Sequence, residues 1–173
     1  MEKPLSYLGR SVECGPMGLH DRSLSRNKLT DVADILRTKG ATVKTVSAGA
    51  SALVVAQRLR RERIGAMIVT NDGSSIEGII SERDLASGLA TYAGNLPNVA
   101  VSELMTKEVI TCSPRDSVSE VAKVMTQRHI RHLPVKDGHQ LVGIITIGDV
   151  LKHRLDEMQL EANVLRDYAI ARE

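Results

Sequence analysis

One short segment of the chain occurs twice, and this duplication limits the folds that are open to it. Residues 78–85 read Gly-Ile-Ile-Ser-Glu-Arg-Asp-Leu, and residues 143–150 read Gly-Ile-Ile-Thr-Ile-Gly-Asp-Val. Both place a glycine, two β-branched apolar residues, a hydroxyl and an aspartate at the same spacing. Two copies of one unit in a chain of 173 residues predict two similar substructures, with two similar binding sites that face each other.

The pattern of apolar and polar residues around each copy predicts a β-α-β-β-α unit with one more helix in front of it. The expected strands are residues 43–46, 66–69 and 76–80 in the first copy, and 109–112, 133–135 and 141–145 in the second. The expected helices are 30–39, 51–63, a helix from 81, 101–105, 118–129 and about 149–171. Ser117 and Glu120 match a capping box. The second helix is expected to turn Leu53, Val54, Ala56 and Leu59 inward.

A three-stranded sheet with helices on one face leaves its other face exposed, so neither half can bury its apolar side alone. We therefore expect an α/β (α+β) fold, in which two β-α-β-β-α repeats pack sheet to sheet with pseudo-twofold symmetry. The expected divisions are a flexible N-terminal tail at 1–27, the first repeat at 28–95, the second at 96–155, and a helical extension at 156–173.

The last helix carries an apolar seam that continues past the repeat unit. Its residues are spaced four, three, four, three, four, which is a heptad pattern; they are Leu151, Leu155, Met158, Ala162, Leu165 and Ala169. Packing onto the body of the same chain is one interpretation. We favour a helix–helix contact between subunits, and therefore expect a homodimer.

Composition excludes several classes of function. The chain has no Phe, no Trp and three Tyr, so its core must be aliphatic and it lacks a base-stacking platform. A net charge of +2 argues against a nucleic-acid partner, although one helix is rich in arginine.

Cys14 and Cys112 lie far apart and are expected to be reduced thiols. With no secretory signal and no apolar run of about 20 residues, the expected location is cytoplasmic, with no membrane partner.

The motifs that catalysis and metal binding require are also missing from the sequence. The five histidines show no metal-ligand spacing with Cys or carboxylates. The chain has no Gly-x-x-x-x-Gly-Lys-Ser/Thr loop, no Gly-x-Gly-x-x-Gly and no Gly-x-Ser-x-Gly. We therefore expect neither an enzyme nor a catalytic cofactor.

The two repeats strongly resemble a pair of CBS domains, the tandem module named after cystathionine β-synthase. The resemblance covers about Val32 to Leu155 and rests on the two duplicated segments, on residues 101–106 (Val-Ser-Glu-Leu-Met-Thr) and on 130–135 (Ile-Arg-His-Leu-Pro-Val). It implies a compact disc-like, non-catalytic regulatory module, here standing alone, that binds adenine nucleotides such as AMP, ATP or NAD(H) between its repeats and senses energy or redox state. The regulated target protein stays unknown.

The chemistry of the motif residues suits such a ligand. An ionised Asp84 or Asp149 could accept both hydroxyls of a ribose, and Ser81 and Thr146 stand at a helix start, where phosphate is attracted. The cations expected to meet phosphate are Arg83, Arg131 and His132. By the family resemblance, the adenine slots are formed by Thr45, Val46, Ile64 and Ala66 in one site, and by Thr111, Cys112, Ile130 and His132 in the other. Pro134 stands where the first repeat has Ile68, so the two sites should differ.

Another interpretation of the duplicated motif involves no ligand. Both hydroxyl-x-x-Asp sequences are good N-terminal helix caps. The alternative function is therefore a structural protein-interaction module whose motifs only cap helices.

Overall fold

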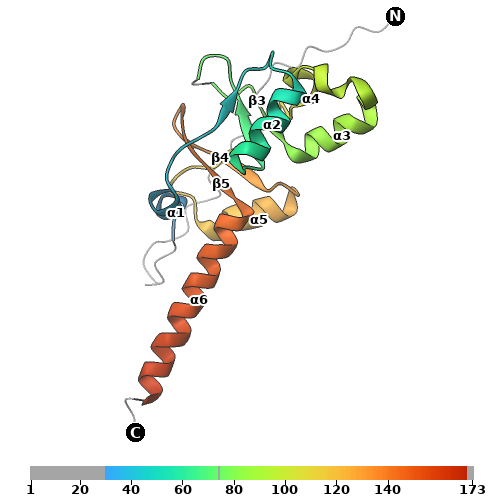
Figure 1. Ribbon diagram of the computed structural model, residues 1–173. Coiled ribbons are helices and arrows are strands. Elements are labelled where there is room, and N and C mark those ends of the chain that lie inside the picture. Colours follow the sequence, from blue (N-terminus) through green and yellow to red (C-terminus); the bar gives the residue numbers. More distant parts are fainter. Residues whose placement is uncertain (1–29, 74, 171–173) are drawn as a thin grey trace, which may run out of the picture.

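The computed structural model describes residues 30–73 and 75–170, without the side chains of residues 168 and 169. The expectations for residues 1–27, for Cys14 and for the last three residues lie outside this range. Figure 1 shows a body of short helices and small sheets from which a long C-terminal helix projects. The mixed α/β class is therefore confirmed.

The first half of the chain forms a three-stranded sheet in the order β1-β2-β3. Strand β2 is parallel to β1 and antiparallel to β3, and all four β2 residues are buried. The elements are α1 (Val32–Lys39), β1 (Thr45–Val46), α2 (Ala52–Glu62), β2 (Ala66–Val69), β3 (Gly78–Ser81) and α3 (Glu82–Tyr92).

The second half repeats this order with a smaller sheet. Strands β4 and β5 pair in antiparallel register, and the expected strand at 109–112 is reduced to a parallel bridge between Cys112 and Val135. Two backbone hydrogen bonds hold that bridge, from Cys112 N to Pro134 O and from Lys136 N to Cys112 O. The elements are the 3-10 helix η1 (Ala93–Asn98), α4 (Val101–Leu104), α5 (Val118–Gln127), β4 (His132–Asp137), β5 (Gln140–Thr146) and α6 (Ile147–Ile170).

Each half completes its apolar core with the leading helix of the other half. Val32 of α1 is fully buried among second-repeat residues such as Met125 and Leu133. Val101 of α4 is fully buried among first-repeat residues such as Val55. The exchange ties the halves together, because a lone half would leave this apolar surface in water.

Backbone hydrogen bonds repeat this exchange at both ends of the pseudo-twofold. Val32 donates its N–H to Asp116 O, at 3.0 Å, and Val118 donates to Thr30 O, also at 3.0 Å. The matching bonds in the other half run from Ala52 N to Val99 O, at 2.9 Å, and from Val101 N to Ala50 O, at 2.8 Å. The pseudo-symmetry expected from the duplicated segment thus extends to the main chain.

Helix α2 buries only one of the four residues expected to face inward, Leu59, while Leu53, Val54 and Ala56 are exposed. Ala52, Val55 and Leu59 are buried, whereas Leu53 and Val54 are 48% and 42% exposed. Both faces have helical spacing, so the periodicity alone does not choose between them. The small side chain of Ala52 faces the core here, beside the Ser51 cap, and the larger Leu53 and Val54 face outward.

Candidate functional site

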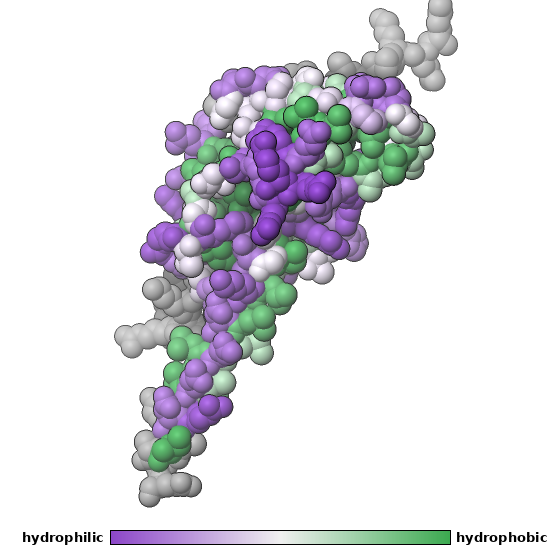
Figure 2. All heavy atoms as spheres, viewed as in Figure 1, coloured by the Kyte–Doolittle hydropathy of each residue, from purple (hydrophilic) through white to green (hydrophobic). Residues whose placement is uncertain are grey.

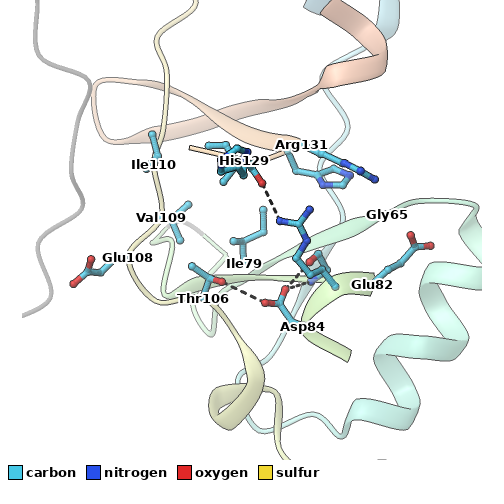
Figure 3. Close-up of a pocket in the computed structure, with 14 residues that line it drawn as sticks. Gly65, Ile79, Glu82, Asp84, Thr106, Glu108, Val109, Ile110, His129 and Arg131 are labelled. Atoms are coloured by element: carbon cyan, nitrogen blue, oxygen red, sulfur yellow. Dashed lines mark hydrogen bonds between the residues drawn. The ribbon is translucent and has the colours of Figure 1, made fainter. Parts of the chain in front are cut away.

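A cavity of about 210 Å³ lies where the two repeats meet, and we call it the inter-repeat cleft. Figure 3 shows Asp84 and Thr106 on one side of it and His129 and Arg131 on the other. Its walls come from the β3–α3 junction, the segment after α4, and the segment between α5 and β4. The lining residues are Gly65, Ile79, Ser81, Glu82, Arg83, Asp84, Thr106, Glu108, Val109, Ile110, His129, Ile130, Arg131 and His132.

Asp84 is held at the start of α3 by a capping box with Ser81. The main-chain N–H and the hydroxyl of Ser81 both donate to Oδ2 of Asp84, at 2.7 and 2.6 Å. The other oxygen, Oδ1, accepts a longer bond of 3.4 Å from the Thr106 hydroxyl. Capping therefore engages mainly one carboxylate oxygen and leaves the second available to the cleft.

Arg83 links the two repeats across the cleft. Its Nη1 donates to the main-chain oxygen of His129, at 2.9 Å, as the dashed line in Figure 3 shows. Arg131 and His132 add basic groups from the second repeat, while Glu82 and Glu108 add acidic ones. The cleft therefore carries both basic and acidic side chains beside an aliphatic wall.

His132 lies against the first repeat at Gly65. A Cβ atom at Gly65 would lie 2.8 Å from Nε2 of His132, so only glycine leaves the imidazole this position. Burial lowers the pKa of His132, and this effect outweighs the nearby Glu82 carboxylate, which raises the pKa. The imidazole is thus favoured in its neutral form at neutral pH.

Aliphatic side chains form the remaining wall of the cleft. They are Ile79, Val109, Ile110 and Ile130. Such a surface can sandwich a flat ring by dispersion and by exclusion of water, which suits a ligand with a heterocycle.

The second copy of the motif has the same internal hydrogen bonds but a different neighbour. Thr146 donates from its N–H and its hydroxyl to Oδ2 of Asp149, both at 2.7 Å. Lys39 of α1 adds an ion pair to the same oxygen, at 2.5 Å. Burial raises the pKa of Asp149, but the bonds from Lys39 and Thr146 outweigh it and leave that pKa below its ordinary value.

The structure brings together six of the expected site residues at the inter-repeat cleft: Ser81, Arg83, Asp84, Ile130, Arg131 and His132. The other nine do not line it. Val46, Ala66, Cys112 and Pro134 are buried in strands or bridges, and Thr111 is also buried. Thr45 accepts a bond from Arg58 at its main-chain oxygen, and Ile64 packs on the first core. Thr146 and Asp149 form the second motif described above.

Sequence reasoning missed the cleft residues that come from the segment after α4. It assigned the adenine slot of the second repeat to Thr111, Cys112, Ile130 and His132. Of these, Ile130 and His132 line the cleft, and Glu108, Val109 and Ile110 line it in place of Thr111 and Cys112. Val109 and Ile110 belong to the same expected strand as Thr111 and Cys112, and Glu108 directly precedes that strand. Thr106 and Gly65 could be recognised only once the two repeats are placed side by side.

The described part of the chain contains neither a cluster of metal ligands nor a helix that could span a membrane. Residues 30–73 and 75–170 contain no group of three or more His, Cys, Asp or Glu side chains that could hold a metal ion. Among the helices described, none is both long and apolar enough to cross a membrane.

Comparison with known proteins gives a consistent result. The model of the CBS domain matches residues 29–91 and 101–156. The CBS domain-containing protein YhcV of Bacillus subtilis is 30% identical over 127 residues, which are 73% of this chain and 87% of that protein. Hypoxic response protein 1 of Mycobacterium tuberculosis is 32% identical over 127 residues, or 72% and 85% of the two chains. Other curated relatives are longer, and the match spans only 29% of a Thermofilum pendens protein and 57% of a Methanopyrus kandleri protein.

Solved structures agree in fold over nearly the whole of the shared module. A CBS-domain containing protein of Agrobacterium tumefaciens is 38% identical with a TM-score of 0.71, over 72% of this chain and 99% of that one. A CBS domain pair in complex with 5′-methylthioadenosine and S-adenosyl-L-methionine is 28% identical with a TM-score of 0.66, over 75% and 98% of the two chains. Since the family model matches twice and covers most of the chain, this protein belongs to the CBS-domain family as a tandem pair.

Proposed function

We propose that this CBS pair is a non-catalytic regulatory module that binds an adenine nucleotide, such as AMP, ATP or NAD(H), in the inter-repeat cleft. In this role it senses the energy or redox state of the cytoplasm. The observation that carries the proposal is Asp84, a carboxylate fixed at a helix start with one oxygen open to the cleft. The related pair that holds 5′-methylthioadenosine and S-adenosyl-L-methionine supports an adenosine-containing ligand.

The geometry of Asp84 suits a ribose. Because Ser81 takes up Oδ2, the carboxylate cannot rotate freely, and Oδ1 receives only the 3.4 Å bond from Thr106. Two vicinal hydroxyls could replace that bond with charge-assisted hydrogen bonds of about 1.5–3 kcal/mol each. The adjacent N-terminus of α3, together with Arg83 and Arg131, would meet a phosphate.

A ligand in this cleft would contact both repeats. Gly65, Ile79 and Asp84 belong to the first, and Ile130 to His132 belong to the second. Arg83 already joins the two through His129. A ligand that fits one relative position of the repeats better than another shifts the population toward that position, and a target protein could read this shift.

Isothermal titration calorimetry with AMP, ATP, NADH and S-adenosylmethionine tests the proposal. We expect the wild type to bind at least one of them, and Asp84→Asn to bind it about 10-fold more weakly or worse. Asp156→Asn, an exposed aspartate on α6, is the matched control and should bind as the wild type does. Lack of binding by the wild type, or equal affinity in Asp84→Asn, would contradict the proposal.

The capping boxes favour a second candidate function, a structural interaction module. Both motifs make the hydrogen bonds that capping requires. This candidate predicts a melting temperature that does not respond to any of the four ligands, whereas a bound ligand raises it by mass action. A thermal melting series with each ligand separates the two functions.

We also infer that the module is a homodimer joined through α6. On this helix Leu151, Leu155, Met158 and Leu165 are each more than half exposed. This exposed seam argues against packing onto the same chain within the described residues. A second copy would supply a matching seam.

A further inference from the structure

The two copies of the motif receive their outside donors from different residues. In the first, Thr106 gives its N–H to Ile79 O, at 2.9 Å, and its hydroxyl to Asp84 Oδ1, at 3.4 Å. In the second, Lys39 Nζ donates to Ile144 O, at 3.1 Å, and to Asp149 Oδ2, at 2.5 Å. The duplicated segment makes Ile79 equivalent to Ile144 and Asp84 to Asp149. The ammonium of Lys39 thus contacts Ile144 and Asp149, which are the equivalents of the two residues that Thr106 contacts in the first copy.

Side-chain packing supports this equivalence of the two sites. A Cβ at Gly78 would lie 2.6 Å from Sδ of Met105, just after α4. A Cβ at Gly143 would lie 2.7 Å from Cδ2 of Leu36, in α1. The leading helices therefore rest on the same glycine of the duplicated segment in each half.

The difference in donor follows from the length of the leading helices. Helix α4 has four residues and helix α1 has eight. The extra turn carries Lys39 past Leu36 to the start of α6, and Gly40, with a φ of +92°, ends α1 directly after it. Gly40 donates its N–H to Leu36 O, at 2.9 Å, which fixes the last turn.

The ion pair offsets the carboxylate charge that would strengthen hydrogen bonds to a diol. Oδ2 of Asp149 already accepts from Thr146 N, Thr146 Oγ1 and Lys39 Nζ. The Lys39 and Asp149 side chains are 32% and 21% exposed, so water screens their attraction less than on an open surface. A ribose would have to compete for this carboxylate with a tethered ammonium, which is present at a high effective concentration.

We propose that Lys39 is a built-in occupant of the second motif, so that the module takes one diol-bearing ligand per chain, at Asp84. The second site is closed while Lys39 is in place and opens when the lysine is withdrawn. This inference rests on the proposed function for the identity of the ligand. It goes beyond that function by assigning the two motifs different roles.

The ligand-free arm of the test measures whether Lys39 holds Asp149. NMR titration of the Asp149 carboxyl should give a higher pKa in Lys39→Met than in the wild type, because methionine keeps the length of the stem but removes the ammonium. Lys123→Met, at an exposed position on α5, is the control and should leave that pKa unchanged. An unchanged Asp149 pKa in Lys39→Met would overturn the inference, whatever the ligand.

The ligand arm measures stoichiometry by equilibrium dialysis with AMP and with 5′-methylthioadenosine. We expect one ligand per chain in the wild type and in Lys123→Met, two in Lys39→Met, and one in Lys39→Met with Asp149→Ala. Two ligands in the wild type, or only one in Lys39→Met, would overturn the inference and leave the proposed function standing. No ligand in the wild type would overturn the proposed function. If the wild type binds no ligand, one ligand in Lys39→Met would still support the role of Lys39. No ligand in Lys39→Met either would overturn both the proposed function and the inference about Lys39.

Discussion

His132 is the residue at which the inter-repeat cleft, the first repeat and the second motif influence one another. Its ring lies against Gly65, and its pKa is lowered first by burial. Glu82 opposes that shift, Lys39 and Arg131 add to it, and Asp149 opposes it. A single imidazole therefore responds to charges from both halves of the chain.

The depressed pKa of His132 predicts a loss of stability in mild acid. The unfolded chain takes up the proton near the ordinary value of 6.5, whereas the folded chain does so only at lower pH. The contribution of the neutral His132 imidazole to the free energy of unfolding is therefore complete above pH 6.5. It declines as the pH falls from 6.5 to the folded-state pKa and is lost below that pKa. Urea unfolding at pH 8.0 and at pH 5.5 should show a smaller loss in His132→Gln than in the wild type. Equal losses in both proteins would contradict this assignment.

The residues of the cleft differ in how far the sequence reveals them. Ser81, Arg83 and Asp84 could be predicted because the duplicated motif marks them and their chemistry fits a ligand. Thr106, Glu108 and Gly65 could not, because their role depends on how one repeat meets the other. Lys39 was missed for the same reason, since 110 positions separate it from Asp149.

At the scale of elements, the exchange of leading helices predicts that a substitution in the leading helix of one half destabilises the core of the other half. Val32 of α1 is fully buried in the second core, so Val32→Ala should lower the free energy of unfolding by about 2 kcal/mol. Hydrogen exchange followed by mass spectrometry should show faster exchange first in β4 and β5, not in the neighbouring β1. Leu89→Ala, at a side chain that is 59% exposed, is the control and should change little. If hydrogen exchange in Val32→Ala became faster only in β1 and β2, this would contradict the packing of α1 on the second core.

Hydrophobic patterning predicted the existence and order of most elements, but not their partners. Alternation and short apolar runs locate β2 and β5, and a capping box locates the start of α5, as the structure shows. The pattern does not reveal that α1 serves the second core, because helical periodicity marks an apolar face without naming what covers it. The expected inner face of α2 was right at Leu59 but wrong at Leu53 and Val54 for a related reason, since Ala52 carries little hydrophobic signal.

At the scale of the whole molecule, α6 is the element that extends beyond the body of the protein. Its first turns pack on the body, where Glu157 accepts from Thr30 and pairs with Arg154. Toward its C-terminal end the helix projects away from the body (Figure 1), and Figure 2 shows apolar side chains running along it beside polar ones. A helix of 24 residues spans about 36 Å, which is long enough for three heptads.

The exposed seam predicts that a single charge abolishes the dimer. Each of its large apolar side chains contributes about 1.5–3 kcal/mol when fully buried, and Leu165 is the most exposed of them. Leu165→Glu would bury a carboxylate from each subunit in an apolar contact, so the variant should be a monomer in sedimentation velocity at micromolar concentration. Asn163→Glu adds the same charge to the same helix outside the seam and should stay dimeric. A wild-type protein that is monomeric at every concentration, or a Leu165→Glu variant that is still dimeric, would show that the seam has another purpose.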